Sequence, residues 1–149
     1  MRVSDAMTRT VCMASPDQTL EEIARLMCDA DIGCLPVRDH DRLVGMITDR
    51  DIAVRAVGSG MGPKTPVRDV MTAEVKYCFE DEDLDDVAQN MGEQQLRRLP
   101  VLDRQKRLVG VLALGDVALV DGNGSAGEAL SQISRPGGDH SQSNESAIH

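Results

Sequence analysis

An internal duplication constrains the fold of this chain of 149 residues more than any other feature of its sequence. Val3-Ser-Asp-Ala-Met-Thr8 recurs 64 positions later as Val67-Arg-Asp-Val-Met-Thr72. Further matches follow in the same order: Leu35-Pro-Val37 with Leu99-Pro-Val101 and, after one inserted residue, Arg42-Leu-Val-Gly45 with Arg107-Leu-Val-Gly110 and Asp51-Ile-Ala53 with Asp116-Val-Ala118. We therefore expect both halves of the chain to adopt the same fold.

Each copy predicts the same order of elements: strand, helix, strand, strand, helix. Thr19 begins a capping box before the first helix, and Asp83 takes the equivalent place in the second copy. Leu35-Pro-Val37 and the almost wholly apolar Leu43–Thr48 predict two strands, the second of them buried. A helix over Asp49–Val57 follows. The expected fold class is α+β (mixed α/β), built as two tandem β-α-β-β-α units.

The expected domains are residues 1–60, residues 61–122, and a mobile tail rich in Gly and Ser over residues 123–149. A unit of about fifty residues buries little apolar surface alone. We therefore expect the two units to pack sheet to sheet with pseudo-twofold symmetry and a cleft between them. The Gly-x-Gly-x-Gly run in the linker, which extends to about residue 66, follows a helix rather than a strand, so we do not interpret it as a phosphate loop.

Composition excludes several kinds of partner. The formal net charge is −9, which is the wrong sign for binding a nucleic-acid backbone, and Tyr77 and Phe79 are the only aromatic residues that could stack on bases. No apolar run is long enough for a membrane span. We expect a cytoplasmic protein that contacts neither nucleic acid nor membrane.

The four cysteines form no Cys-x-x-Cys pair, and we interpret them as small apolar residues. A metal or redox site built from Cys12, Cys34 and Cys78 is the alternative. The histidines show no spacing with a serine, cysteine or carboxylate that indicates catalysis, and two of the three lie in the expected tail. We expect no enzymatic activity.

The Val-x-Asp-x-Met-Thr opening, the Leu-Pro-Val strand and Leu-Val-Gly-Met-Ile-Thr-Asp-Arg-Asp-Ile52 resemble the CBS domain, named after cystathionine β-synthase. Two copies over residues 1–120 resemble a stand-alone CBS pair, or Bateman module. The resemblance implies a regulatory module that binds AMP, ADP, ATP or an S-adenosyl compound between its repeats, forms a homodimer and signals to another protein. Apolar helix stripes also favour a closed dimer. No cofactor is required.

Thr48-x-x-Asp51 is the main candidate for ligand contact. It lies where a strand becomes a helix, and an ionised aspartate there can accept hydrogen bonds from two ribose hydroxyls. The helix N-terminus favours a phosphate, and Arg50 adds a cation. The resemblance assigns the ribose and the neighbouring phosphate to Thr48 and Asp51. The same pattern is also that of a helix cap that needs no ligand.

The second copy has Ala113 in place of the threonine but keeps the aspartate as Asp116. A missing hydroxyl weakens that site by roughly 1 kcal/mol. Arg97 and Arg98 are candidate phosphate contacts there, with further charge from Arg104, Lys106 and Arg107. Ordinary solvated charge beside a turn is the alternative interpretation.

The resemblance places the adenine ring beside five residues that could equally belong to the core: Val11, Cys12, Leu35, Pro36 and Val37. Two other functions stay open. One is a structural dimerisation or interaction module with vestigial clefts, which Ala113 favours. The other is a cysteine-based metal or redox sensor.

Overall fold

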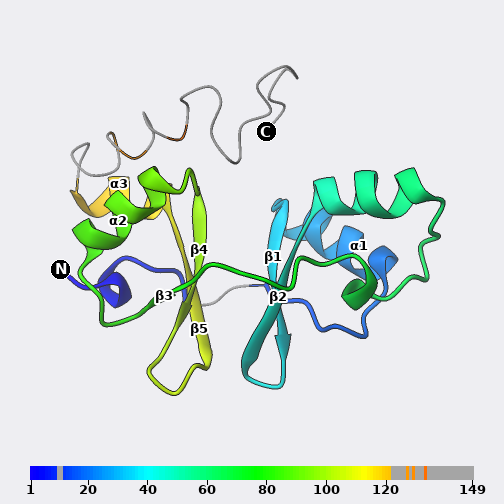
Figure 1. Ribbon diagram of the computed structural model, residues 1–149, viewed down its shortest axis with the longest axis horizontal. Coiled ribbons are helices and arrows are strands. Elements are labelled where there is room, and N and C mark those ends of the chain that lie inside the picture. The colour runs from blue at the N-terminus through cyan, green and yellow to red at the C-terminus, as the bar shows by residue number, and fades with distance from the viewer. Residues whose placement is uncertain (10–11, 122–126, 128, 130–132, 134–149) are drawn as a thin grey trace. The chain divides into compact units, whose positions relative to one another are not determined.

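The computed structural model describes residues 1–9, 12–121, 127, 129 and 133, which form a mixed α/β fold as predicted (Figure 1). The first strands and helices are α1 (Leu20–Ala30), β1 (Cys34–Asp39), β2 (Arg42–Thr48) and η2 (Asp51–Ala56). They are followed by β3 (Cys78–Phe79), α2 (Leu84–Glu93), β4 (Arg98–Leu102), β5 (Leu108–Ala113) and α3 (Leu114–Asp121). Short 3-10 turns, η1 (Val3–Asp5) and η4 (Val67–Asp69), mark the two opening segments.

The two predicted helix caps are present. The Thr19 hydroxyl accepts a hydrogen bond from the Glu22 amide at 3.2 Å, and the Asp83 carboxylate accepts one from the Asp86 amide at 3.3 Å. Each cap satisfies an amide that has no partner inside its helix. The expected helix over Asp49–Val57 is also present, with η2 forming its π-helical centre.

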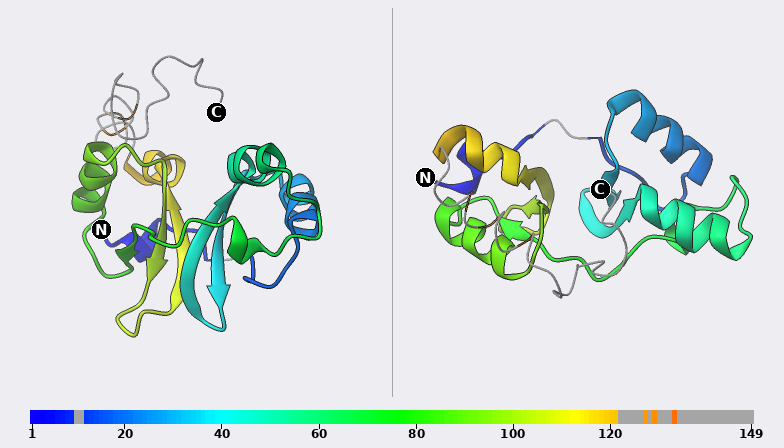
Figure 2. Two further views of the ribbon diagram at one scale, coloured as in Figure 1. Left: turned by 45° about the vertical axis from the view of Figure 1, so that its right-hand side comes forward. Right: turned by 90° about the horizontal axis from the view of Figure 1, so that it is seen from above.

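The helices cover one face of each small sheet (Figure 2). β1 and β2 pair antiparallel, with Leu35 opposite Ile47. The other sheet has the order β3-β4-β5, in which β3 runs parallel to β4. Successive side chains of a strand point to opposite faces of its sheet, so every second strand residue faces the helices. These residues pack against the apolar stripes of the helices and form one core in each unit.

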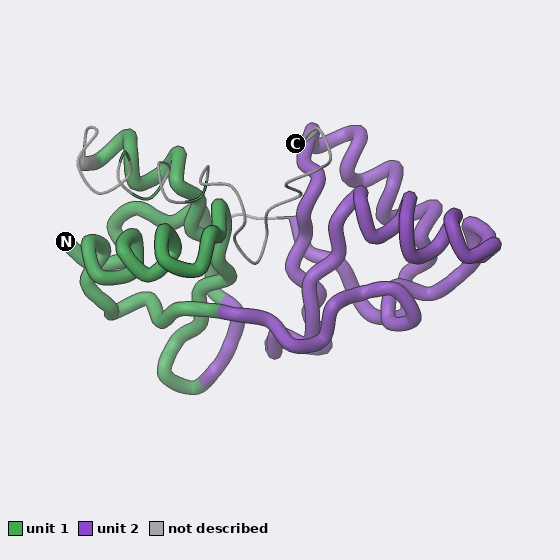
Figure 3. The backbone as a smooth tube through the Cα atoms, turned by 45° about the horizontal axis from the view of Figure 1, so that its top comes forward, with its two compact units in different colours: residues 1–9, 77–105, 109–149 green, residues 10–76, 106–108 purple. Residues whose placement is uncertain are grey.

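The structure divides into two compact units (Figure 3). Unit 1 comprises Met1–Arg9, Tyr77–Gln105 and Val109–His149, and unit 2 comprises Thr10–Lys76 and Lys106–Leu108. These units do not coincide with the two sequence copies, because each contains the opening segment of the other copy.

Equivalent hydrogen bonds hold the exchanged segments in place. The Val3 amide donates to the Glu82 carbonyl at 3.0 Å, and the Val67 amide donates to the Gln18 carbonyl at 2.8 Å. Both valines are 0% exposed. The first copy's opening segment therefore completes the core of unit 1, and the second copy's opening segment completes that of unit 2.

Part of the expected tail packs on unit 1. Ala129 is buried in its core, and Ile133 packs against that core. Both residues are apolar, and their burial adds to the core of unit 1. The other residues of that segment, apart from the exposed Gly127, lie outside the described part of the chain, as does the candidate Val11.

Candidate functional site

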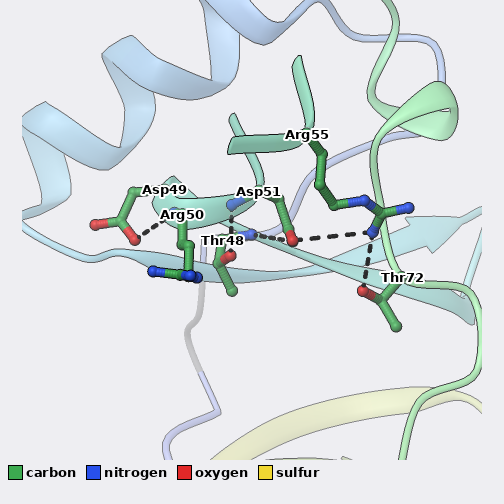
Figure 4. Close-up of polar contacts among 6 residues, drawn as sticks. All are labelled: Thr48, Asp49, Arg50, Asp51, Arg55 and Thr72. Carbon is green, nitrogen blue, oxygen red and sulfur yellow. Dashed lines mark hydrogen bonds and ion pairs between the residues drawn. The ribbon is translucent and has the colours of Figure 1, made fainter. Parts of the chain in front are cut away.

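The junction between β2 and η2 holds Thr48 and Asp51 in a reciprocal pair of hydrogen bonds (Figure 4). The Asp51 amide donates to Thr48 Oγ1 at 3.0 Å, and the Thr48 amide donates to Asp51 Oδ2 at 3.0 Å. This is the geometry of a capping box. Capping, the alternative interpretation of the motif, is therefore realised in the structure.

The cap uses only part of the hydrogen-bond acceptor capacity of the Asp51 carboxylate. One of its oxygens accepts the Thr48 amide, and the other, Oδ1, lies 3.9 Å from Arg55 Nη1. A carboxylate offers about four lone-pair positions. The Asp51 side chain is 17% exposed, so it is partly accessible at the protein surface. The arrangement can accept further hydrogen bonds from hydroxyl groups of a ligand.

Arg55 and Thr72 also belong to this site, although no motif in the sequence predicts them. Arg55 Nη1 donates to Thr72 Oγ1 at 3.4 Å (Figure 4). Arg55 could have been found from its position four residues after Asp51 in an expected helix. Thr72 belongs to the second copy's opening segment, which exchanges two backbone hydrogen bonds with Met46 of β2. No local pattern connects it with Asp51.

Arg50 lies in the same turn as Thr48 and Asp51 and is exposed. Its amide donates to Asp49 Oδ1 at 2.8 Å, and the Asp49 amide donates to the Gly33 carbonyl at 2.9 Å. These two bonds fix the backbone of the turn. The structure therefore brings the predicted Thr48, Arg50 and Asp51 together.

The apolar candidates lie in the interior of unit 2. Leu35 and Val37 are 0% exposed and belong to its core, and Pro36 is also buried. Cys12 is half-buried and packs against the same core. The burial of these side chains agrees with their interpretation as core residues.

The second copy repeats only half of the arrangement. The Ala113 amide donates to Asp116 Oδ2 at 3.0 Å, but Ala113 has no hydroxyl to accept a bond in return. The Leu114 amide donates to the Arg97 carbonyl at 3.0 Å, as the Asp49 amide does to Gly33 in the first copy. Arg97 therefore lies beside the Asp116 turn through its backbone, and its neighbour Arg98 begins β4; both residues are exposed.

Arg104, a further member of the predicted basic cluster, has partners within unit 1. Its Nε lies 3.0 and 2.9 Å from the two carboxylate oxygens of Asp81, and its guanidinium lies 4.2 Å from the centre of the Phe79 ring. The hydrogen bond from Arg104 holds the pKa of Asp81 below its usual value. This arginine is therefore already engaged at the surface.

Cys78, one of the three cysteines considered for a metal or redox site, lies in the core of unit 1. Cys78 is buried, and burial, together with the nearby Glu82, raises the pKa of its thiol to about 12. Across the described residues, no three side chains of His, Cys, Asp or Glu are grouped as a metal ion would require. Within the same residues, no helix has the length and apolar character of a membrane span.

An apolar groove of about 450 Å³, which no motif in the sequence predicts, lies in unit 2. It runs between α1, η2 and the linker that follows. One wall carries Leu20, Ala24 and Cys28, which are spaced four residues apart and therefore share a face of α1. The groove is also lined by Ile52, Val57 and Met61.

Comparison with known proteins finds the CBS domain twice, in residues 3–58 and 67–123. The CBS domain-containing protein YhcV of Bacillus subtilis is 45% identical over 133 residues, which are 89% of this chain and 94% of that protein.

Two solved structures show what related pairs bind. The CBS domain pair of protein MJ0100, in complex with 5-methylthioadenosine and S-adenosyl-L-methionine, is 31% identical, with a TM-score of 0.70, and the match covers 83% of this chain and 97% of that one. CBSX2 in complex with AMP is 26% identical, with a TM-score of 0.71, and the match covers 80% of this chain and 94% of that one.

Proposed function

Since the chain belongs to the CBS domain family and carries two copies of that domain, we propose that it is a regulatory module that binds an adenine nucleotide or adenosyl ligand. Its output is a signal to another protein rather than a reaction of its own. AMP in one related structure and two adenosyl compounds in another support this class of ligand.

The Asp51 carboxylate is the observation that carries the proposal. It is held in place by the Thr48 amide, retains acceptor capacity and is partly exposed. Hydrogen bonds from the two ribose hydroxyls to this anion are charge-assisted, and each contributes about 1.5–3 kcal/mol. In this proposal Thr48 and Arg50 face the adjoining phosphate.

The second site, at Asp116, is proposed to bind the same class of ligand more weakly. Its aspartate also caps a helix through one oxygen, but Ala113 supplies no hydroxyl. Arg97 and Arg98 are the proposed phosphate contacts there. The two copies therefore differ in ligand affinity rather than in the kind of ligand.

The test is calorimetric titration with AMP, ATP and S-adenosylmethionine. Asp51→Asn keeps an oxygen for the Thr48 amide but loses the charge, so it separates ligand binding from capping. We expect it to weaken binding about tenfold to a hundredfold, corresponding to the loss of one charge-assisted contact of about 1.5–3 kcal/mol. Asp116→Asn is the matched variant in the other copy, and we expect it to have a smaller effect.

Thermal unfolding without ligand controls for stability. A folded Asp51→Asn variant that binds as tightly as the parent would disprove the ribose contact. If the parent protein binds none of the three compounds, the proposed ligand class is wrong.

A structural interaction module is the second candidate function. It is favoured by the cap itself, because Thr48 and Asp51 satisfy one another without a ligand, and by Ala113 in the second copy. Failure of all three ligands to bind, together with an intact oligomer, would support this function.

We also propose that the chain forms a homodimer. Val54 and Leu119 occupy equivalent positions in the two copies and are 52% and 87% exposed. Val57 is exposed and lines the apolar groove beside α1. Exposed apolar side chains gathered on helices mark protein interaction surfaces, and a closed twofold contact covers the same surface on both chains.

We propose the cytoplasm as the place of action. None of the four cysteines is assigned to a disulfide, as is typical of a reducing compartment.

A further inference from the structure

We infer that Arg55 is the residue that makes the Asp51 site selective for a phosphorylated adenosine over adenosine itself. The inference rests on the proposed function, since it concerns the ligand of the same site. It adds a specificity-determining side chain that the motif Thr48-x-x-Asp51 does not include.

The position of Arg55 carries the argument. Its Nη1 lies 3.9 Å from Asp51 Oδ1 and 3.4 Å from Thr72 Oγ1, which places the guanidinium at the edge of the carboxylate proposed for ribose (Figure 4). A phosphate on the same sugar then lies next to this cation. Asp51 and Arg55 come from η2, Thr48 comes from β2 and Thr72 from the second opening segment, so all belong to unit 2.

The chemistry of Arg55 suits a phosphate better than it suits its present partners. A guanidinium carries five N–H donors in a planar fork that binds phosphate oxygens in pairs. The contact with Asp51 is a long ion pair, and the contact with Thr72 is a single hydrogen bond. The side chain is 49% exposed, so it is accessible to a ligand from solvent.

The second copy lacks this cation. Its equivalent of Asp51 is Asp116, and four residues further along α3 stands Val120. Any recognition of phosphate there has to come from other residues, such as Arg97 and Arg98. Arg55 is therefore a feature of one site and not of the repeat.

The experiment compares AMP with adenosine in an Asp116→Asn background, so that the Asp51 site is measured. Arg55→Val introduces the residue of the second copy. We expect it to reduce AMP affinity by about tenfold or more, and adenosine affinity by less than about threefold. Arg55→Lys keeps the charge without the planar fork and should fall between the parent and Arg55→Val.

Arg25→Val is the matched control. Arg25 also follows a carboxylate by four helical positions, with its Nη2 3.5 Å from Glu21 Oε1, but it lies on α1. We expect it to leave the AMP-to-adenosine ratio unchanged.

The outcomes separate the two proposals. Equal losses for AMP and adenosine in Arg55→Val would show that Arg55 only positions Asp51 and would overturn the inference while the proposed function stands. An equal change of the AMP-to-adenosine affinity ratio in Arg25→Val would also overturn the inference, because the effect would then come from the overall charge of the protein. If neither compound binds the parent protein, the proposed function itself fails.

Discussion

At the scale of single residues, two matched glycines allow the exchanged segments to approach the strands. A Cβ built on Gly45 would lie 2.9 Å from the Thr72 carbonyl oxygen and 2.7 Å from Met71 Sδ. A Cβ built on Gly110 would lie 2.7 Å from the Thr8 carbonyl oxygen. Backbone atoms cannot move aside as a flexible side chain can. The glycine of each Leu-Val-Gly segment therefore serves close backbone pairing.

We predict that Gly45→Ala lowers the free energy of unfolding by about 1–3 kcal/mol, because the added methyl group forces β2 away from the segment at Thr72. Urea denaturation measures this loss. Gly62→Ala is the control, since nothing lies within 4 Å of its added Cβ, and it should change stability by at most about 0.5 kcal/mol. A Gly45→Ala protein as stable as Gly62→Ala would contradict the close approach.

At the scale of elements, the opening segments belong to the units that they complete rather than to the copies in which they are encoded. Val67→Ala removes two methyl groups from the core of unit 2 and should cost about 2 kcal/mol. We predict faster amide hydrogen exchange in α1, β1 and β2. Val3→Ala is the matched variant and should instead loosen α2 and β4, because Val3 lies in the core of unit 1. The reverse pattern of amide hydrogen exchange would contradict this assignment of the opening segments to the two units.

Local patterns predicted most of the elements, but in place of the strand expected to open the first copy the described residues before α1 have only isolated bridges, such as that between Ala14 and Val37. In the caps at Thr19 and Asp83, a side-chain oxygen accepts from the backbone amide three residues later, and the structure confirms both. The exchange of opening segments between the two copies could not be predicted, because Val3 and Val67 stand in near-identical motifs that fit either core. The contact between Arg55 and Thr72 depends on that exchange, so it was missed as well.

At the scale of the whole molecule, we predict that Leu119→Asp converts the proposed dimer into a species near the 16.1 kDa of one chain, because a charge replaces an exposed apolar contact. Light scattering measures the mass. Ala73→Asp adds the same charge at an exposed residue outside η2 and α3 and should leave the dimer intact. Each chain carries a formal charge of −9, so the dimer should also tighten as salt screens the repulsion. A parent protein that stays monomeric at micromolar concentration would contradict the dimer.

The exchange of opening segments also sets an order of events during synthesis on the ribosome. Residues 10–76 hold nearly all of unit 2, so that unit can assemble while the second copy is still being translated. The segment at Val3 leaves the ribosome before all of these residues, yet its partners at Glu80 and Glu82 come some eighty positions later, and β5 later still. The segment at Val3 is thus translated well before its partners and is among the last parts of unit 1 to reach its native contacts. Until then the apolar side chains of Val3 and Met7 are not covered by the core of unit 1.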